Sequence, residues 1–90
     1  MLKTYMIGYD LNSPGQGYDE LIKAIKALGT WWHCLDSTWL IRSELTAAQI
    51  RDHLKQFTDS NDELLVARMS GEGAWIGFNT KCSEWLKNNL

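Results

Sequence analysis

The sequence lacks the features that mark several large classes of protein. No run of apolar residues approaches the roughly 18 that a membrane-spanning helix needs, so we expect no membrane partner. Nine Lys and Arg against eleven Asp and Glu give a formal net charge of −2, which disfavours a general nucleic-acid binder. The N-terminus has one lysine, Lys3, and no small-residue cleavage site. We therefore expect no signal peptide and a cytoplasmic location.

Cysteine is scarce, and two common catalytic signatures are missing. Cys34 and Cys82 are the two cysteines, and their spacing is not that of metal ligands. They could pair, but in a chain without a signal peptide we expect free thiols, with Cys34 in a buried strand. Neither the G-x-S-x-G motif of serine hydrolases nor a glycine pattern of nucleotide-binding loops occurs.

The residues that are present predict one small α+β domain over 1–90. The chain has 90 residues, of which 44% are hydrophobic, and five tryptophans. A domain of this size buries only about 60–65% of its unfolded surface, so we expect a homodimer that buries more.

Hydrophobic periodicity gives the order of the elements. An apolar run bounded by turn residues predicts a central strand over 3–10, and helical spacing predicts a helix over 18–28 with Gly29 as its C-cap. Aromatic and β-branched residues over 30–43 predict two strands, or one strand broken by a bulge. Thr46 and Gln49 form a capping box that begins the second helix. Three further elements are then predicted: a strand over 64–69, a hairpin to a strand over 74–78, and a short helix from about 80.

This order is β-α-β-β-α-β followed by a strand and a short helix. It predicts a ferredoxin-like fold with a C-terminal extension.

The most informative motif is Tyr9-Asp10-Leu11, at the end of the first predicted strand. Functional side chains are often placed on loops that a rigid scaffold positions, and Asp10 leads into the turn cluster that begins at Asn12. A simpler interpretation is that Asp10 hydrogen-bonds its own turn.

With two further motifs, the chain resembles the superfamily of CRISPR-associated protein 2 endonucleases and virulence-associated protein D ribonucleases. It is most similar to the small bacterial proteins loosely called SinR-like. The further motifs are Gly29 before the aromatic strand Trp31-Trp32-His33, and the triplet Ser37-Thr38-Trp39. The element order also matches, and the resemblance spans about residues 3–70.

The resemblance implies a metal-dependent nuclease that works as a homodimer. Asp10 from each protomer would hold a divalent ion, expected to be Mg²⁺, and Ser37 would lie near the cleft. Two carboxylates that meet across a two-fold axis repel, and a hard cation relieves that repulsion. The ion could polarise a phosphodiester and lower the pKa of a bound water.

Other candidate residues carry two interpretations each. His33 is either a half-buried, hydrogen-bonded strand residue or a general base or metal ligand. Asp36 either stabilises a turn or adds a second carboxylate beside Asp10. Glu72 and Trp75, in Gly71-Glu72-Gly73-Ala74-Trp75, lie either in a plain hairpin turn or in a loop that contacts ligand. Tyr9 and Asn12, which flank Asp10 and its loop, complete the predicted substrate-binding set.

Three functions follow, in order of preference. The first is a Mg²⁺-dependent endoribonuclease or phosphodiesterase acting on RNA, with Asp10, Asp36, Ser37 and His33 in its site. The second is a non-catalytic dimeric binding or assembly module for a protein, nucleic acid or nucleotide, which the acidic net charge favours. The third is a toxin–antitoxin-like partner whose C-terminal helix docks on another protein.

Overall fold

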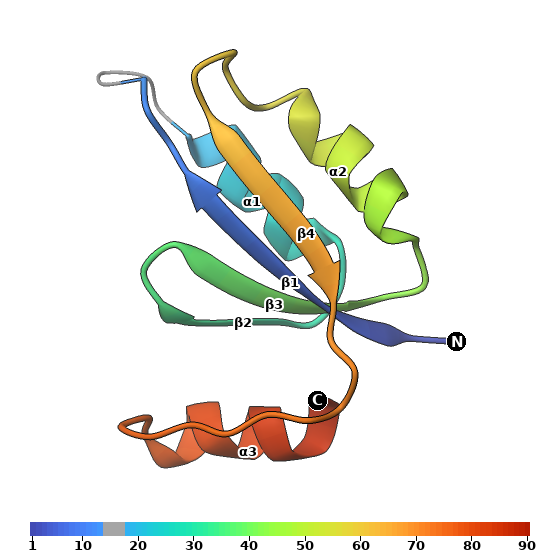
Figure 1. Cartoon of the computed structure of the whole chain (residues 1–90), viewed down its shortest axis with the longest axis vertical. Coiled ribbons are helices and arrows are strands. Elements are labelled where there is room, and N and C mark those ends of the chain that lie inside the picture. The colour runs from blue at the N-terminus through green and yellow to red at the C-terminus, as the bar shows by residue number, and fades with distance from the viewer. Residues whose placement is uncertain (14–17) are drawn as a thin grey trace.

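The chain forms a four-stranded antiparallel sheet with two helices on one face and a third helix at one end (Figure 1). This computed structural model describes residues 1–13 and 18–90. The strands lie in the order β2-β3-β1-β4, with every neighbouring pair antiparallel. That order and the α+β composition confirm the predicted ferredoxin-like class. The elements are β1 (Lys3–Asp10), α1 (Asp19–Ala27), β2 (Trp31–Leu35), β3 (Thr38–Ser43), α2 (Ala47–Lys55), β4 (Glu63–Arg68) and α3 (Thr80–Asn89).

The first strand is central, as its two-sided apolar pattern predicts. β1 pairs with β3 from Lys3 to Gly8 and with β4 from Tyr5 to Asp10. Asp10, the last residue of β1, lies opposite Glu63, the first residue of β4. The C-terminal end of β1 therefore meets the N-terminal end of an edge strand.

The two faces of the sheet bury different sets of side chains. Tyr5 and Ile7 point to the face that α1 and α2 cover, where they join the larger core. Met6 points to the other face and packs with Trp32 and Leu40 against α3. Because side chains alternate along a strand, Gly8 and Asp10 share the face of Met6. The members of the larger core that are almost fully buried are Tyr5, Ile7, Leu21, Ala24, Ile25, Trp39, Ile41, Ile50 and Leu54.

Both predicted helices in the first two-thirds of the chain are present. In α2, the Thr46 hydroxyl accepts from the backbone N–H of Gln49, and the Gln49 side chain accepts from the backbone N–H of Thr46. The predicted capping box is therefore confirmed. α1 has Asp19 and Glu20 in its first turn and Lys26 in its last, which suits the helix dipole.

Gly29 follows α1 but serves a purpose other than the predicted cap. Its φ of 158° is close to extended backbone, outside the compact left-handed conformation of a capping glycine. A Cβ built on it would lie only 2.1 Å from the backbone oxygen of Arg42 in β3. Glycine is needed there because the backbone leaving α1 passes directly against the backbone of β3.

The predicted strand over 74–78 and the hairpin turn before it do not form. Among the described residues, this segment is irregular and follows β4 without pairing to it. Trp75 and Phe78 both pack on the Trp32 and Leu86 cluster. Residues three apart point to opposite sides of a strand, so a strand could not bury both against one surface. Burial of both aromatic rings in one cluster therefore prevents the strand that the local pattern predicts. The short C-terminal helix was predicted correctly and is α3.

The expectation of free thiols was wrong. Cys34 in β2 and Cys82 in α3 form a disulfide. Trp32 lies on the same face of β2 as Cys34, and its indole N–H donates to the backbone oxygen of Cys82 at 3.1 Å. The packing of α3 against β2 brings the two sulfur atoms together, and the spacing of the cysteines in the sequence does not predict this packing.

Candidate functional site

Asp10 lies at the exposed end of β1, on the sheet face opposite α1 and α2. Gly8 precedes it on the same face, and a Cβ built on Gly8 would meet nothing within 4 Å. α3 packs at the other end of the molecule, away from the C-terminal end of β1 (Figure 1). The surface beside Asp10 is thus open within one protomer.

A shallow depression of about 360 Å³ surrounds Asp10. The backbone N–H of Tyr9 donates to the backbone oxygen of Ser37 at 3.2 Å, which holds the β2–β3 turn against the end of β1. Two predicted site residues, Asp10 and Ser37, are therefore neighbours in the structure. We call this surface the Asp10 depression; it is lined by Gly8, Tyr9, Asp10, Ser37, Thr38, Glu63, Leu64 and Leu65.

Asp36 lies in the same turn as Ser37. It is exposed and precedes the serine that forms part of the wall of the Asp10 depression. The turn therefore carries Asp36 to the same end of the sheet as Asp10, as the second of its two sequence interpretations requires.

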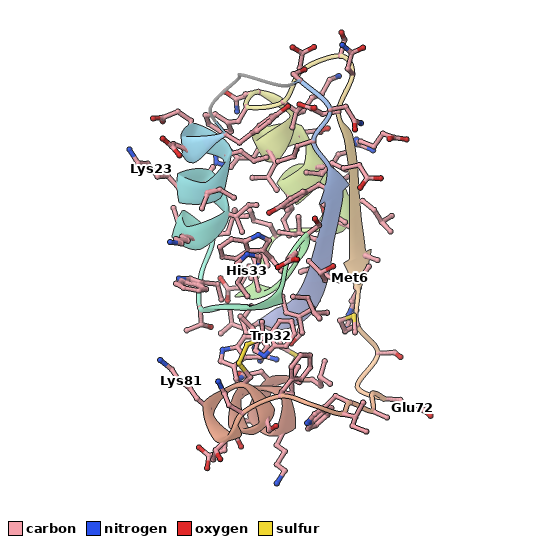
Figure 2. All side chains as sticks on the ribbon, turned by 90° about the vertical axis from the view of Figure 1, so that its left-hand side faces the viewer. Met6, Lys23, Trp32, His33, Glu72 and Lys81 are labelled. Atoms are coloured by element: carbon pink, nitrogen blue, oxygen red, sulfur yellow. A yellow bond between two sulfur atoms is a disulfide. The ribbon has the colours of Figure 1, made fainter. Side chains whose placement is uncertain are left out.

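The side chains of Tyr9 and His33 lie on the opposite face, toward α1 and α2. The Tyr9 hydroxyl accepts from the indole N–H of Trp39 at 3.0 Å. The ring of His33 stacks on Trp39 with 3.8 Å between centroids, and its Nδ1 lies 3.1 Å from the backbone oxygen of Thr38. Figure 2 shows His33 on the α1 side of the sheet and Met6 on the other. His33 is half-buried and hydrogen-bonded, and the sheet separates it from Asp10.

Asn12 joins the loop after β1 to the loop before β4. Its backbone N–H donates to Asp62 at 2.7 Å, and its side-chain amide donates to the backbone oxygen of Asn61 at 2.9 Å. The same amide lies 3.4 Å from the carboxylate of Glu63. Asn12 thus has a clear structural role in joining these two loops beside Glu63.

The same two loops hold ionised carboxylates by hydrogen bonding. Partial burial acts to raise the pKa of Asp62, but the backbone N–H groups of Asp59 and Asn12 and the Tyr18 hydroxyl outweigh it and hold that pKa below its usual range. The backbone N–H of Asn61, followed by smaller contributions, lowers the pKa of Asp59. Hydrogen bonds to a charged carboxylate favour the charged form.

Glu72 and Trp75 do not join the Asp10 depression. Figure 2 shows Glu72 near α3, in the segment that follows β4. The indole N–H of Trp75 donates to the hydroxyl of Ser83 in α3 at 3.2 Å, and its ring packs beside Trp32. Trp75 therefore anchors its segment to α3, and Glu72 is exposed at a distance from Asp10.

Glu63 is the residue that sequence reasoning missed. It lies directly across from Asp10 in the β1–β4 pairing, and residues paired in this way point to the same face. The predicted fold could have revealed Glu63, because the ferredoxin-like strand order places the fourth strand antiparallel beside the first. The end of one strand then faces the start of the other.

The donors around Asp10 suit a hard cation. Asp10 and Glu63 offer carboxylates, and Ser37 and Thr38 offer hydroxyls, which are the oxygen donors that Mg²⁺ prefers. Within the described part of the chain, no three His, Cys, Asp or Glu side chains are grouped to hold a metal. A cation bound by one protomer would therefore need water, or a second copy of the chain, to complete its coordination.

In the residues that the structure describes, no helix is long and apolar enough to cross a membrane. No protein-family model and no solved structure matches this chain.

Proposed function

We propose that the protein is a homodimeric, Mg²⁺-dependent phosphodiesterase that acts on RNA. The observation that carries the proposal is the pair of carboxylates, Asp10 and Glu63, facing each other at an open end of the sheet. Two like charges so placed repel, and a divalent cation between them relieves this cost. Asp10 and Glu63 would hold the ion.

Each group in the Asp10 depression has a role in this proposal. The bound ion supplies a Lewis acid for the phosphodiester and a water of lowered pKa. Ser37 and Thr38 orient a phosphate oxygen or the attacking water through their hydroxyls. Asp36, in the adjoining turn, would accept a hydrogen bond from a water molecule in the depression. We assign no proton transfer to His33, since it lies across the sheet from Asp10.

A second copy of the chain is part of the proposal. Leu65 lies next to the two carboxylates, and 57% of its surface is exposed. It shares their face of the sheet, because side chains alternate along β4. Burying Leu65 against its counterpart would bring two Asp10–Glu63 pairs close enough to share metal ions and would exclude water from them.

The test is a cleavage assay on RNA and DNA with Mg²⁺ or Mn²⁺. Loss of an outer hydrogen-bond partner of a metal ligand already costs about 10–100-fold. We therefore expect Asp10→Asn to lower metal-dependent RNA cleavage by about 100-fold or more, and Glu63→Gln to lower it by about tenfold or more. Asp19→Asn and Glu84→Gln, exposed carboxylates on α1 and α3, are the matched controls and should leave the rate unchanged.

Cleavage that survives Asp10→Asn would remove the proposed role of that residue. If the pure protein binds RNA, a nucleotide or a protein but never cleaves, the second candidate function holds. This is a non-catalytic dimeric binding module, which the net charge of −2 and the exposed Leu65 favour.

A further inference from the structure

An apolar hollow of about 200 Å³ lies between the sheet and the segment that leads into α3. None of the described residues that line it carries a charge. A dry cavity of about 150 Å³ in another protein holds a benzene molecule, so this hollow has room for a single aromatic ring. We call it the aromatic hollow, after three of the side chains that line it; the lining residues used below are Met6, Trp32, Leu35, Thr38, Trp75 and Phe78.

The strand register places the floor of the aromatic hollow on one face of the sheet. Met6 pairs with Leu40, which pairs in turn with Trp32 of β2. Paired residues point to the same face, and all three pack in the cluster beside α3 (Figure 2). Asp10 follows Met6 by four residues along β1, so it points to this face as well. The hollow and the proposed metal site therefore share one surface of the sheet.

The aromatic hollow is continuous with the Asp10 depression. Thr38 lines both of them. It pairs with Gly8, which has no side chain, and open space surrounds the position that a Cβ on Gly8 would take. No side chain of β1 therefore stands between Met6 and Asp10 on this face. The two residues are about 14 Å apart along the strand, and a ligand bound at Asp10 can continue into the hollow.

Trp75 contributes an aromatic ring that is fixed in place and has no aromatic partner. Its indole N–H donates to the hydroxyl of Ser83 at 3.2 Å, which sets the plane of the ring. The ring is partly exposed, and the aromatic pairs among residues 1–13 and 18–90 do not include it. Trp32 and Phe78, by contrast, pack edge to face with 5.1 Å between their centroids. A fixed ring of this kind loses little conformational freedom when a planar ligand stacks on it.

The mouth of the aromatic hollow adds a few polar groups to the apolar walls. Leu35 lines the hollow and is 49% exposed, so the hollow opens to solvent beside it. Gly73 and Ala74 also line it, and within the described part of the chain their backbone groups make no backbone–backbone hydrogen bond. Thr38 offers a hydroxyl. Apolar walls with neutral donors and acceptors at the rim suit a nucleobase, which has two apolar faces and a polar edge.

We propose that the aromatic hollow binds one base of a single-stranded RNA. Unpaired bases are commonly stacked on aromatic side chains, whereas bases in a duplex are held within their own stack. The choice of RNA as the ligand rests on the proposed function, which places a phosphodiester at Asp10. An unstacked strand covers about 14 Å in a few nucleotides, so the bound base lies a few positions from the phosphate that is cleaved. The hollow thus makes single-stranded RNA the substrate class.

A purely structural role explains only part of this arrangement. Trp75 anchors its segment to α3 through Ser83, and this alone would justify a tryptophan there. It does not explain the unfilled space of about 200 Å³ beside the ring, because packed protein interiors leave few voids larger than a water molecule. The test therefore compares two substitutions that both remove the anchor and differ in the aromatic ring.

The experiment is an NMR titration of the full chain with its disulfide intact. It is done without metal, so that binding is measured apart from cleavage. The probes are a single-stranded RNA hexamer and an abasic ribose–phosphate oligomer of the same length and charge. We expect saturable shifts of the Trp75 indole N–H and of the Gly73 and Ala74 amides with the RNA, and none with the abasic oligomer.

Substitutions of Trp75 test the stacking itself. Trp75→Leu should raise the dissociation constant of the RNA hexamer by about tenfold, the usual effect of losing one stacked base. Trp75→Phe loses the same indole N–H but keeps a ring, and should raise it by less than about threefold. Trp31→Leu is the matched control, because Trp31 is 43% exposed on the opposite face of the sheet, and it should change the constant by less than about twofold.

The shifts in the unmodified protein decide the matter even if a variant loosens α3. The indole N–H of Trp32, which donates to the backbone oxygen of Cys82, reports whether α3 stays in place. If the RNA gives no saturable shifts at the hollow, or the abasic oligomer gives equal ones, the proposal is wrong. Equal losses of affinity in Trp75→Leu and Trp75→Phe would also contradict it.

The outcome is separable from that of the cleavage assay. RNA cleavage that depends on Asp10, without shifts at the hollow, would leave the proposed function standing and overturn this inference. Shifts at the hollow in a protein that never cleaves RNA would support this inference and count against the proposed function.

Discussion

Gly8 and Gly29 differ in the space available for a side chain, so alanine substitutions at the two positions can be compared directly. A methyl group on Gly29 would collide with the Arg42 backbone, whereas one on Gly8 would meet open space. We expect Gly29→Ala to lower the free energy of unfolding by about 1–3 kcal/mol, the usual cost of overpacking. Gly8→Ala should be neutral or stabilising by up to about 1 kcal/mol, because alanine suits a strand better. Urea unfolding of both variants measures this, and equal destabilisation would contradict it.

Asp62 is expected to make stability depend on pH. Its pKa is lower in the folded chain than in the unfolded one, so the folded state binds fewer protons. Its contribution is therefore present above the unfolded pKa, near 4, and is lost as the pH falls through the lower folded value. Asp62→Asn should be less stable than wild type at pH 7, and the difference should shrink below about pH 4.

The comparison needs an exposed carboxylate as a control. Glu72→Gln is suitable, because Glu72 lies exposed in the segment after β4. Urea unfolding at several pH values gives the two curves. A difference between Asp62→Asn and wild type that stays constant down to pH 3 would show that the hydrogen bonds there do not depend on the charge.

At the scale of elements, the contribution of the α2 capping box to stability can be tested by removing one atom, the hydroxyl oxygen of Thr46. The Thr46 hydroxyl accepts a backbone hydrogen bond at 3.1 Å and forms half of the capping box. Thr46→Ala should cost about 1 kcal/mol of folding free energy, while Thr46→Ser, which keeps the hydroxyl, should cost less than half of that. Thermal or urea unfolding distinguishes the two, and equal losses would indicate that the methyl group matters instead.

Elements whose signals are local could be predicted from the sequence. The capping box of α2 and the apolar run of β1 need only neighbouring residues to be recognised, and both form as expected. The segment 74–78 has a local strand pattern, yet the docking of Trp75 and Phe78 on α3 and β2 decides its conformation. That decision depends on contacts across the whole chain, so a local pattern could not supply it.

The residues of the candidate site also divide into those with a local signal in the sequence and those that only the strand pairing reveals. Asp10 could be found from its place at a strand end, and Ser37 from its motif. Glu63 became visible only through its pairing with β1. His33 shows the reverse case, since its motif placed it near Asp10 and the alternation of the sheet placed it on the other face.

For the whole molecule, the disulfide changes one expectation about its surroundings. Disulfides persist mainly in oxidising compartments and are rare where thiols are kept reduced. The cytoplasmic location, which was predicted from the N-terminal sequence, stays a prediction, and the disulfide does not favour it. Homodimer formation and an RNA substrate stay predictions, which the cleavage assay and a measurement of oligomeric state address.

The bond between Cys34 and Cys82 also makes part of the chain a ring. The two residues are 48 positions apart, and the ring contains β3, α2 and β4. One proteolytic cut in the loop after α2, for example at the exposed Ser60, therefore leaves two fragments that remain covalently joined. On a denaturing gel, the nicked protein should run as one species without reductant and as two with it. All four strands and the three helices would thus remain one covalent unit after a cut that divides an ordinary linear chain.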